Sequence, residues 1–326
     1  MAPPATSVRA DLSARSPAVR ARALAALLED PDAAGRCVRE VGERIRDDDV
    51  GLRHTAAVVL SKTGRDGVDG LIRGLSPRQP GSVRIQAAAG LGSIGPEAED
   101  AVDALGACLF AKEDDLRWHA SRALGRIGEP SVEPVLRLLD VMETPPPRVA
   151  ACDALGEVGP PAKNAVKALK RLSKADEPSV RFAALSALAL ITEGKKKYIA
   201  PLIVQSKHED PEVRRDALVR IGRQRSHGHC AVKRVVELLG DEEPEVRAEA
   251  AYTMGRIEAE PAKYTEALVP LLRDPVRDVR LAAGAALSAF GPPAESALPE
   301  LEARLSDPDE GVRSVARAAV QSIGGE

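Results

Sequence analysis

Apolar and small residues recur along this chain at helical spacing, and the same pattern returns about every 33 residues. The stretch SVRIQAAAGLGSIGP, which begins at Ser82, shows one copy. Its residues Val83, Ala87, Leu91 and Ile94 fall on one face of a helix. Other copies read LRWHASRALGRIGEP, VRRDALVRIG and VRLAAGAALSAFGPP. The chain is therefore built from one repeated helical phrase.

The residue that opens each copy, here called the anchor, is followed by Arg in every case. Successive anchors lie 31 or 33 residues apart. So constant a period rules out an ordinary domain with a single core and is typical of a solenoid. The anchors are Val19, Leu52, Val83, Leu116, Pro147, Val180, Val213, Val246, Val279 and Val312.

Each copy is predicted to contain two helices, A and then B, with the anchor near the start of B. Asp-Pro pairs are expected to cap helix starts, because Asp accepts hydrogen bonds from free N–H groups and Pro tolerates the first turn. Gly is expected to end helices in the left-handed conformation. The Asp-Pro pairs begin at Asp210, Asp274 and Asp307, the glycines are Gly95, Gly128, Gly159 and Gly291, and helix A is expected at 98–110, 162–172 and 294–305.

These residues resemble HEAT repeats, in particular the bacterial HEAT-like class named after phycobilisome lyases. The resemblance extends from about Val8 to Ile323. It implies an all-α fold, a right-handed α-α superhelix of about ten helix pairs. We expect residues 1–7 to be a loose N-terminus and residues 8–326 to form a single solenoid.

Composition narrows the cellular setting. Charged residues make up 29% of the chain, aromatic residues 2%, and the formal net charge is −3. The N-terminal stretch has no apolar segment typical of a signal peptide, and no apolar run is long enough to span a bilayer. We therefore expect a cytoplasmic protein with no membrane contact. The four cysteines are far apart in sequence and are expected to be reduced and buried.

Candidate chemistry is sparse. His227, His229 and Cys230 have side chains that bind metals, but no fourth ligand is near them, so we expect neither a metal nor any other cofactor. HEAT-repeat deoxyhypusine hydroxylases use several His-Glu pairs, and this chain has one, His208-Glu209. No catalytic motif is evident. HEAT-like DNA glycosylases use a strongly basic surface with aromatic residues, and here the isoelectric point is about 6.1, which argues against nucleic acid as a partner.

Protein binding remains, and the resemblance implies that helix B lines the concave face. Positions 3, 6 and 10 after each anchor fall between the buried positions and are expected to face outward, Ala150 and Ala282 among them. Trp118, two residues after its anchor, is expected to pack between repeats and to expose an edge that would serve a partner. A solvated face with internal ion pairs is the alternative. The candidate interaction residues are Trp118, His119, Arg122, Arg126, Asp153, Glu157, Arg223, Glu249, Tyr252 and Arg256.

An Arg stands directly after the anchor in every repeat. So constant a position predicts a structural ladder of arginines along the chain. The resemblance implies that it donates hydrogen bonds near the turn of an adjacent repeat, with Asp114, Asp176, Asp241 and Asp274 as acceptors; a ladder that binds a ligand is the alternative. The ladder residues are Arg20, Arg53, Arg84, Arg117, Arg148, Arg181, Arg214, Arg247, Arg280 and Arg313.

The function that these patterns favour is a non-catalytic scaffold or adaptor that binds another protein on its concave face. The alternative is a regulatory or lyase-type subunit that acts on a chromophore-bearing or cofactor-bearing protein. The sequence leaves the oligomeric state and the identity of the partner open.

Overall fold

A computed structural model describes residues 5–257 and 260–325 of the chain. Within these residues the secondary structure is helical and contains no strand, as the repeat pattern predicted. The helices follow one another as ten pairs, each with a helix A and then a helix B. The B helices are α2 (Pro17–Glu29), α5 (Val50–Ser61), α7 (Gly81–Ile94), α9 (Asp114–Ile127), α11 (Pro145–Val158), α13 (Pro178–Ile191), α15 (Pro211–Arg223), α17 (Pro244–Arg256), α19 (Arg277–Phe290) and α21 (Glu310–Gly324).

The A helices are shorter and less regular. Among the described residues, seven 3₁₀ turns connect or end these segments. Two examples are η2 (Gly95–Ala101) and η7 (Pro292–Ala297). The α-helical parts are α1 (Ala5–Leu12), α3 (Pro31–Arg36), α4 (Val38–Arg44), α6 (Val68–Gly74), α8 (Val102–Cys108), α10 (Val132–Val141), α12 (Val166–Leu172), α14 (Lys196–Gln205), α16 (Val232–Leu238), α18 (Pro261–Leu268) and α20 (Leu298–Arg304).

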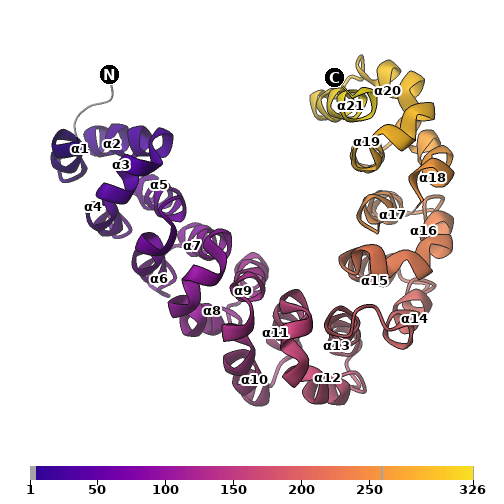
Figure 1. Cartoon of the computed structure of the whole chain (residues 1–326), viewed down its shortest axis with the longest axis horizontal. Helices are drawn as coiled ribbons and strands as arrows, with labels where there is room; N and C mark the ends of the chain where they lie inside the picture. The colour runs from indigo at the N-terminus through magenta and orange to yellow at the C-terminus, as the bar shows by residue number, and fades with distance from the viewer. Residues whose placement is uncertain (1–4, 258–259, 326) are drawn as a thin grey trace. The chain divides into compact units, whose positions relative to one another are not determined.

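The pairs group into two compact units, Met1–Ala187 and Leu188–Glu326, with the boundary inside α13. In the first unit the A helices α4, α6, α8 and α10 form one row and the B helices α2, α5, α7, α9 and α11 form a second row (Figure 1). Successive B helices in each unit make far more extensive contacts than successive A helices. Closer spacing on the B side makes the B row the inner row of each unit, where the concave surface was expected.

Glycines at position 9 after the anchor allow this close approach. A Cβ atom on Gly92 of α7 would lie 3.1 Å from the Cα atom of Ala123 in α9. A Cβ atom on Gly255 of α17 would lie at the same distance from the Cα atom of Ala286 in α19. Contacts this short leave no room for a larger side chain. The small residues of the B helices therefore set the distance between neighbouring repeats.

The glycines at the ends of α7, α9, α11 and α19 differ in one respect from the expected cap. Gly95, Gly128, Gly159 and Gly291 have φ values of 74°, 90°, 73° and 64°. Their ψ values lie between −134° and −147°, so they are not in the left-handed helical conformation that the sequence predicted. This region is also accessible to glycine and very costly for other residues. These glycines end their helices as predicted, but the predicted left-handed helical conformation was wrong.

Two expected helix starts were also wrong. Asp210 caps α15 by accepting a hydrogen bond from the Glu212 N–H at 2.9 Å, as expected. Asp274 and Asp307, however, precede their helices by more than one residue, because α19 begins at Arg277 and α21 at Glu310. Their carboxylates are used by the turn and by an arginine of the preceding repeat. Helix A is likewise shorter than predicted, because the Gly-Pro segments 95–101 and 292–297 wind as 3₁₀ turns with a non-helical residue inside.

Helix α1 begins at Ala5, so part of the segment expected to be loose is helical; residues 1–4 of that segment lie outside the described residues. Two positions expected to face outward do not. Ala150 is 7% exposed and Ala282 is fully buried. The close B–B packing explains both, since position 3 lies at the helix–helix contact wherever its side chain is small.

Candidate functional site

The arginine that follows each anchor makes a regular ladder in the second unit. Arg214 donates from Nε and Nη2 to the two carboxylate oxygens of Asp241, at 2.9 and 2.7 Å. Arg247 binds Asp274 in the same way at 2.8 and 3.1 Å, and Arg280 binds Asp307 at 2.9 and 3.1 Å. Each acceptor lies 27 residues further along the chain, in the turn of the next repeat.

Each of these arginines also holds the turn of its own repeat. Nη1 of Arg247 donates to the carbonyl oxygens of Asp241 and Glu242 at 2.9 and 3.0 Å. Asp241 therefore accepts hydrogen bonds from Arg214 through its carboxylate and from Arg247 through its backbone carbonyl oxygen. The same carboxylate also accepts the Glu243 N–H at 3.1 Å, which closes the turn. Asp241 thus joins two successive arginines and a turn, which links repeats 7 and 8.

The first unit has one complete rung of this kind. Arg20 donates to Asp47 at 2.7 and 2.8 Å, and the two side chains are 10% and 1% exposed. The other rungs end on weaker acceptors. Arg53 contacts Gln79 at 3.5 Å, Arg84 and Arg148 donate to the carbonyl oxygens of Leu75 and Met142, and Arg117 and Arg181 donate to their own turns. In the last repeat Arg313 donates to the carbonyl oxygens of Asp307 and Pro308.

The expected acceptors therefore divide into two groups. Asp241 and Asp274 accept through carboxylates from the preceding repeat, as the resemblance implied. Asp114 instead forms an ion pair with Arg117 of its own repeat, and Asp176 accepts from Arg181 through its backbone oxygen. The sequence carries a signal for this division, because the residue 27 positions after the ladder Arg is Asp only for Arg20, Arg214, Arg247 and Arg280.

The candidate interaction residues of the first unit centre on α9. Trp118 is 52% exposed, so its expected packing between repeats is wrong. The ring of His119 meets the Trp118 ring edge-on, with centroids 4.6 Å apart and an interplanar angle of 89°. The guanidinium carbon of Arg122 lies 4.7 Å from the centre of the Trp118 ring, a cation–π arrangement. These three residues, Trp118, His119 and Arg122, are called the aromatic patch below.

The charge of the aromatic patch comes from Arg122. Burial lowers the pKa of His119, and the positive charge of Arg122 lowers it further, so the imidazole is neutral near pH 7. No ion pair joins Arg122 to a carboxylate in residues 5–257 and 260–325. The patch therefore presents an exposed indole beside a half-buried cation that has no internal carboxylate partner.

Arg126 has a structural contact that the sequence reasoning missed. Its Nη1 donates to the carbonyl oxygen of Gly92 at 3.4 Å, at the end of the preceding B helix. Position 10 makes the same contact in other repeats, where Lys62 donates to Leu28 and Ser322 to Ser288, both at 2.9 Å. In each case the acceptor lies 34 residues earlier. The recurrence of polar residues at position 10 was the available signal for this second set of links between repeats.

Asp153 and Glu157 lie on α11, the B helix that follows α9. Asp153 is half-buried and Glu157 is exposed, and each takes part in an interaction of its own. Glu157 also packs against α9, where a Cβ atom on Gly125 would meet its Cβ atom at 2.3 Å. Glu157 therefore packs against the helix that carries the aromatic patch, and the role of Asp153 and Glu157 in an interaction surface stays a prediction.

The second unit carries a related but neutralised group. Arg256 of α17 donates to Glu249 at 2.9 Å, and its guanidinium carbon lies 5.8 Å from the centre of the Tyr252 ring. Burial raises the pKa of Glu249, an effect that the charge of Arg256 opposes. Arg223 is half-buried and engaged in an interaction of its own. This group matches the alternative of a face with internal ion pairs, whereas the aromatic patch does not.

Metal chemistry finds no support in the described part of the chain. There, no group of three or more His, Cys, Asp or Glu side chains is placed to hold an ion. His229 lies 3.8 Å from Glu260, and the Cys230 thiol donates to the His227 carbonyl oxygen at 3.9 Å. Cys37, Cys108 and Cys152 are buried and free, and Cys230 is free and exposed. Among the same residues, none of the helices is both long and apolar enough to cross a bilayer.

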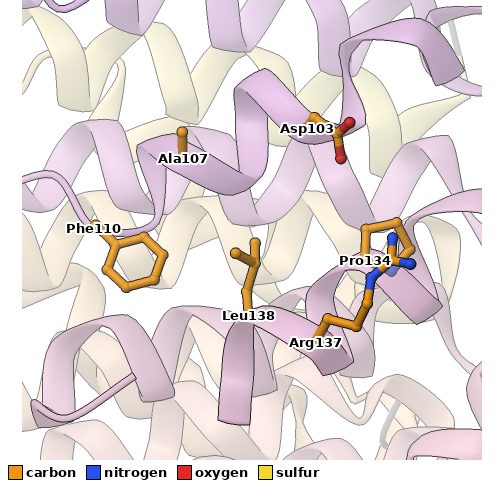
Figure 2. A pocket seen from close by; sticks show the side chains of 6 residues that line it. All are labelled: Asp103, Ala107, Phe110, Pro134, Arg137 and Leu138. Carbon is orange, nitrogen blue, oxygen red and sulfur yellow. The ribbon is translucent and has the colours of Figure 1, made fainter. Parts of the chain in front are cut away.

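A groove of about 400 Å³ lies on the opposite side of the first unit, between the A helices α8 and α10. Figure 2 shows Phe110 at one end, Leu138 in the middle and Asp103 with Arg137 toward the other end. Phe110 is 44% exposed. This groove is the main rival of the aromatic patch as a contact surface, and it serves as a control below.

A family model of HEAT repeats matches residues 68–141, 137–220, 199–264 and 232–321. The chain belongs to the HEAT-repeat family. This confirms the resemblance drawn from the anchors, and the ten helix pairs are HEAT-like repeats.

Individual relatives of this HEAT-repeat chain match more weakly. It is 34% identical over 84 residues to the uncharacterized protein SkfG of Bacillus subtilis (strain 168). That match covers 26% of the chain and 48% of SkfG, so the chain spans about half the length of this curated relative.

Two solved structures align with this HEAT-repeat chain. The karyopherin Kap121p, bound to the extreme C-terminus of the protein phosphatase Cdc14p, aligns with a TM-score of 0.50 at 11% identity, over 98% of this chain and 46% of Kap121p. The complex of CpcE and CpcF of phycocyanin lyase from Nostoc sp. PCC7120 aligns with a TM-score of 0.43 at 20% identity, over 86% of this chain and 93% of that one. At these identities the likeness concerns the fold alone.

Proposed function

We propose that this HEAT-repeat protein is a non-catalytic scaffold or adaptor, and that it binds a protein partner through the aromatic patch on the B face of its first unit. The observation that carries the proposal is the exposure of Trp118 beside Arg122. A large indole that is 52% exposed is costly to leave in water, and Trp and Arg are the residues that most often dominate binding energy in interfaces.

The alternative of a solvated, internally paired surface fits the second unit better than the first. Arg256 is neutralised by Glu249, and Tyr252 is only 36% exposed. Arg122 has neither a carboxylate partner among the described residues nor a hydrogen bond that fixes it to another repeat. A residue held only by a cation–π contact is free to change partners when a ligand arrives.

An enzymatic role would require polar groups that converge on adjacent B helices. Among the described residues, the polar contacts between neighbouring repeats include the ladder, the position 10 links and the hydrogen bond from Thr253 to the Leu218 carbonyl oxygen, and these contacts are used for structure. The lyase-type alternative gains no residue from these contacts. The solved Kap121p, which shares the fold, is itself bound to a segment of another protein, which is the kind of role proposed here.

The test is affinity capture from native-host lysate with the full chain as bait, followed by mass spectrometry. The decisive variant is Trp118→Ala with Arg122→Glu, because neither side chain donates a hydrogen bond to another described repeat. It should lose the captured partner while its circular dichroism melt stays unchanged. Two matched controls, Tyr252→Ala with Arg256→Glu and Phe110→Ser with Arg137→Glu, should keep it.

Loss of capture by the Phe110 variant alone would move the contact to the groove between α8 and α10. Loss by the Tyr252 variant alone would move it to the second unit. Either result contradicts the proposed site, and capture that survives all three pairs of substitutions contradicts binding through these surfaces.

A further inference from the structure

The B face of the first four repeats has an excess of positive charge. At positions 3, 6 and 10 after the anchors of repeats 1 to 4, the cationic residues are Arg22, Lys62, Arg122 and Arg126, and the one carboxylate is Glu29. In the structure none of these four cations forms an ion pair with a described carboxylate. Lys62 and Arg126 donate to backbone carbonyl oxygens, which leaves their charge uncompensated.

The same positions elsewhere do not repeat this excess. In repeats 7 and 8 they hold Asp216 and Glu249 against Arg223 and Arg256, and Glu249 and Arg256 form an ion pair. In repeat 5 they hold Asp153 and Glu157, so the positive region ends at α9. The cationic face therefore belongs to repeats 1 to 4 and is not a general property of the B helices.

Apolar groups lie along the same face, between these charges. Position 6 is Val58 in repeat 2 and Ala89 in repeat 3, both half-buried, and Trp118 is exposed in repeat 4. Adjacent helices in contact are about 8–10 Å apart, so the distance from α2 to α9 is about 30 Å. An extended chain covers that distance with about nine residues at roughly 3.3 Å each.

From this pattern we propose that the ligand of the B face is an acidic, extended peptide segment with an apolar or aromatic side chain that packs on Trp118. Its carboxylates pair with Arg122 and with the cations of repeats 1 and 2, and its apolar side chain covers the exposed indole. The statement rests on the proposed function, since it names the class of partner for the same site.

Peptide fits the observations better than nucleic acid, the other polyanion that a positive surface attracts. Nucleic-acid binding is built on many closely spaced phosphate contacts, usually with several aromatic residues that stack on bases. Here four cations are spread over repeats 1, 2 and 4, the chain has a single Trp, and its formal net charge is −3. Sparse cations separated by apolar side chains suit a peptide with alternating carboxylate and apolar groups.

The test selects ligands without knowledge of the partner. The full chain is panned against a displayed library of random 12-residue peptides, in parallel with the variant Arg22→Glu with Arg122→Glu. Neither arginine donates a hydrogen bond to another described residue, so the fold should be retained, which a circular dichroism melt verifies. The best peptide is then measured by fluorescence anisotropy against its amide version, with Asn and Gln in place of Asp and Glu.

The expected result is enrichment of Asp and Glu with at least one aromatic or large apolar residue, lost with the charge-reversed variant. The amide peptide should bind at least about tenfold more weakly, because charge-assisted contacts contribute more than neutral ones. Binding should also weaken as salt rises.

The other outcomes separate the two proposals. Peptides that depend on Trp118 but show no acidic enrichment overturn the acidic ligand and leave the protein-binding site in place. Recovery of no peptide above background contradicts the proposal that the ligand is a peptide segment. If capture from lysate also fails, the proposed function is contradicted as well. Tighter binding of a labelled (dT)₂₀ oligonucleotide than of the best peptide, lost on Arg122→Glu, would replace peptide by nucleic acid.

Discussion

At the scale of single residues, the arginine that follows the anchor makes different hydrogen bonds in different repeats. Arg214, Arg247 and Arg280 each bind a carboxylate of the next repeat and two carbonyl oxygens of their own. Arg181 lacks the carboxylate, donates only to Ala175 and Asp176, and lies over the Phe182 ring. The number of hydrogen bonds that each loses on truncation therefore differs, although Arg follows the anchor in every repeat.

The first prediction follows from this difference. Arg247→Ala should lower the free energy of unfolding by about 1.5–3 kcal/mol, because it leaves Asp274 without its charged donor. Arg181→Ala should cost less, and Arg122→Ala should stay within about 0.5 kcal/mol, as surface changes usually do. Urea unfolding followed by circular dichroism measures all three. Equal midpoints and slopes for the Arg247 and Arg122 variants would show that the ladder contributes nothing to stability.

The second prediction concerns acid. Burial alone would raise the pKa of Asp307, but hydrogen bonds from Arg280 and from the Asp309 N–H outweigh it, and its pKa lies below the ordinary value. A carboxylate held in this way stabilises the fold fully above its unfolded pKa of about 3.9, and that stability is lost as the pH falls through the lower folded pKa. The pKa of Asp47 is lowered for the same reasons, with Arg20 as the donor.

Asp307→Asn should therefore be less stable than the parent chain at pH 7, and the difference should shrink near pH 3. Urea midpoints at the two pH values give the comparison. A difference that stays constant across this range would mean that the Asp307 carboxylate does not supply the acid sensitivity.

At the scale of helices, the spacing between repeats depends on the small side chains at the contacts between B helices. Gly92 and Ala123 bring α7 and α9 together, and Gly255 and Ala286 do the same for α17 and α19. This packing also explains why Ala150 and Ala282 are buried at a position where longer side chains reach solvent.

The third prediction enlarges one of these contacts. Gly92→Val should destabilise the first unit by about 1–3 kcal/mol, because the added atoms meet the backbone of Ala123 and force the two helices apart. Ser93→Val, the control, introduces the same side chain at the next, exposed position of α7. Thermal melts of both variants provide the test, and a Gly92 variant as stable as the Ser93 variant would contradict close packing as the determinant of spacing.

The repeat period and the positions of the B helices could be predicted from the sequence because they depend on local patterns of apolar residues. Val83, Leu91 and their equivalents recur at the same positions after each anchor. This constant spacing fixes which face of each B helix is buried. The details of the turns could not, because they depend on competition for the same acceptor. Asp274 can cap a helix or bind Arg247, and only the packed neighbour decides between these roles.

An exposed edge of Trp118 was expected from the sequence, but the extent of its exposure could not be predicted for a similar reason. Position 2 after the anchor holds half-buried Ile85, Val149, Phe182 and Leu281 in other repeats, which favoured packing. The indole is larger than these side chains, and it lies instead against His119 and Arg122 on its own helix.

At the scale of the whole molecule, the two units present chemically different B faces. The first carries uncompensated cations and the exposed indole, whereas the second carries Glu249 paired with Arg256. A scaffold built from equivalent repeats thus acquires a specific surface through a few substitutions at positions 2, 3, 6 and 10. Binding should accordingly depend on the first unit, with the second contributing little to ligand discrimination.

Trp118, the single Trp of the chain, makes this claim directly measurable. In the free protein an indole that is 52% exposed should be readily quenched by acrylamide. Saturation with a bound ligand that lacks Trp, either the captured partner or the selected acidic peptide, should shift the emission to shorter wavelength and reduce quenching severalfold. Unchanged emission and quenching at a ligand concentration where calorimetry shows full binding would place the ligand elsewhere and contradict the account.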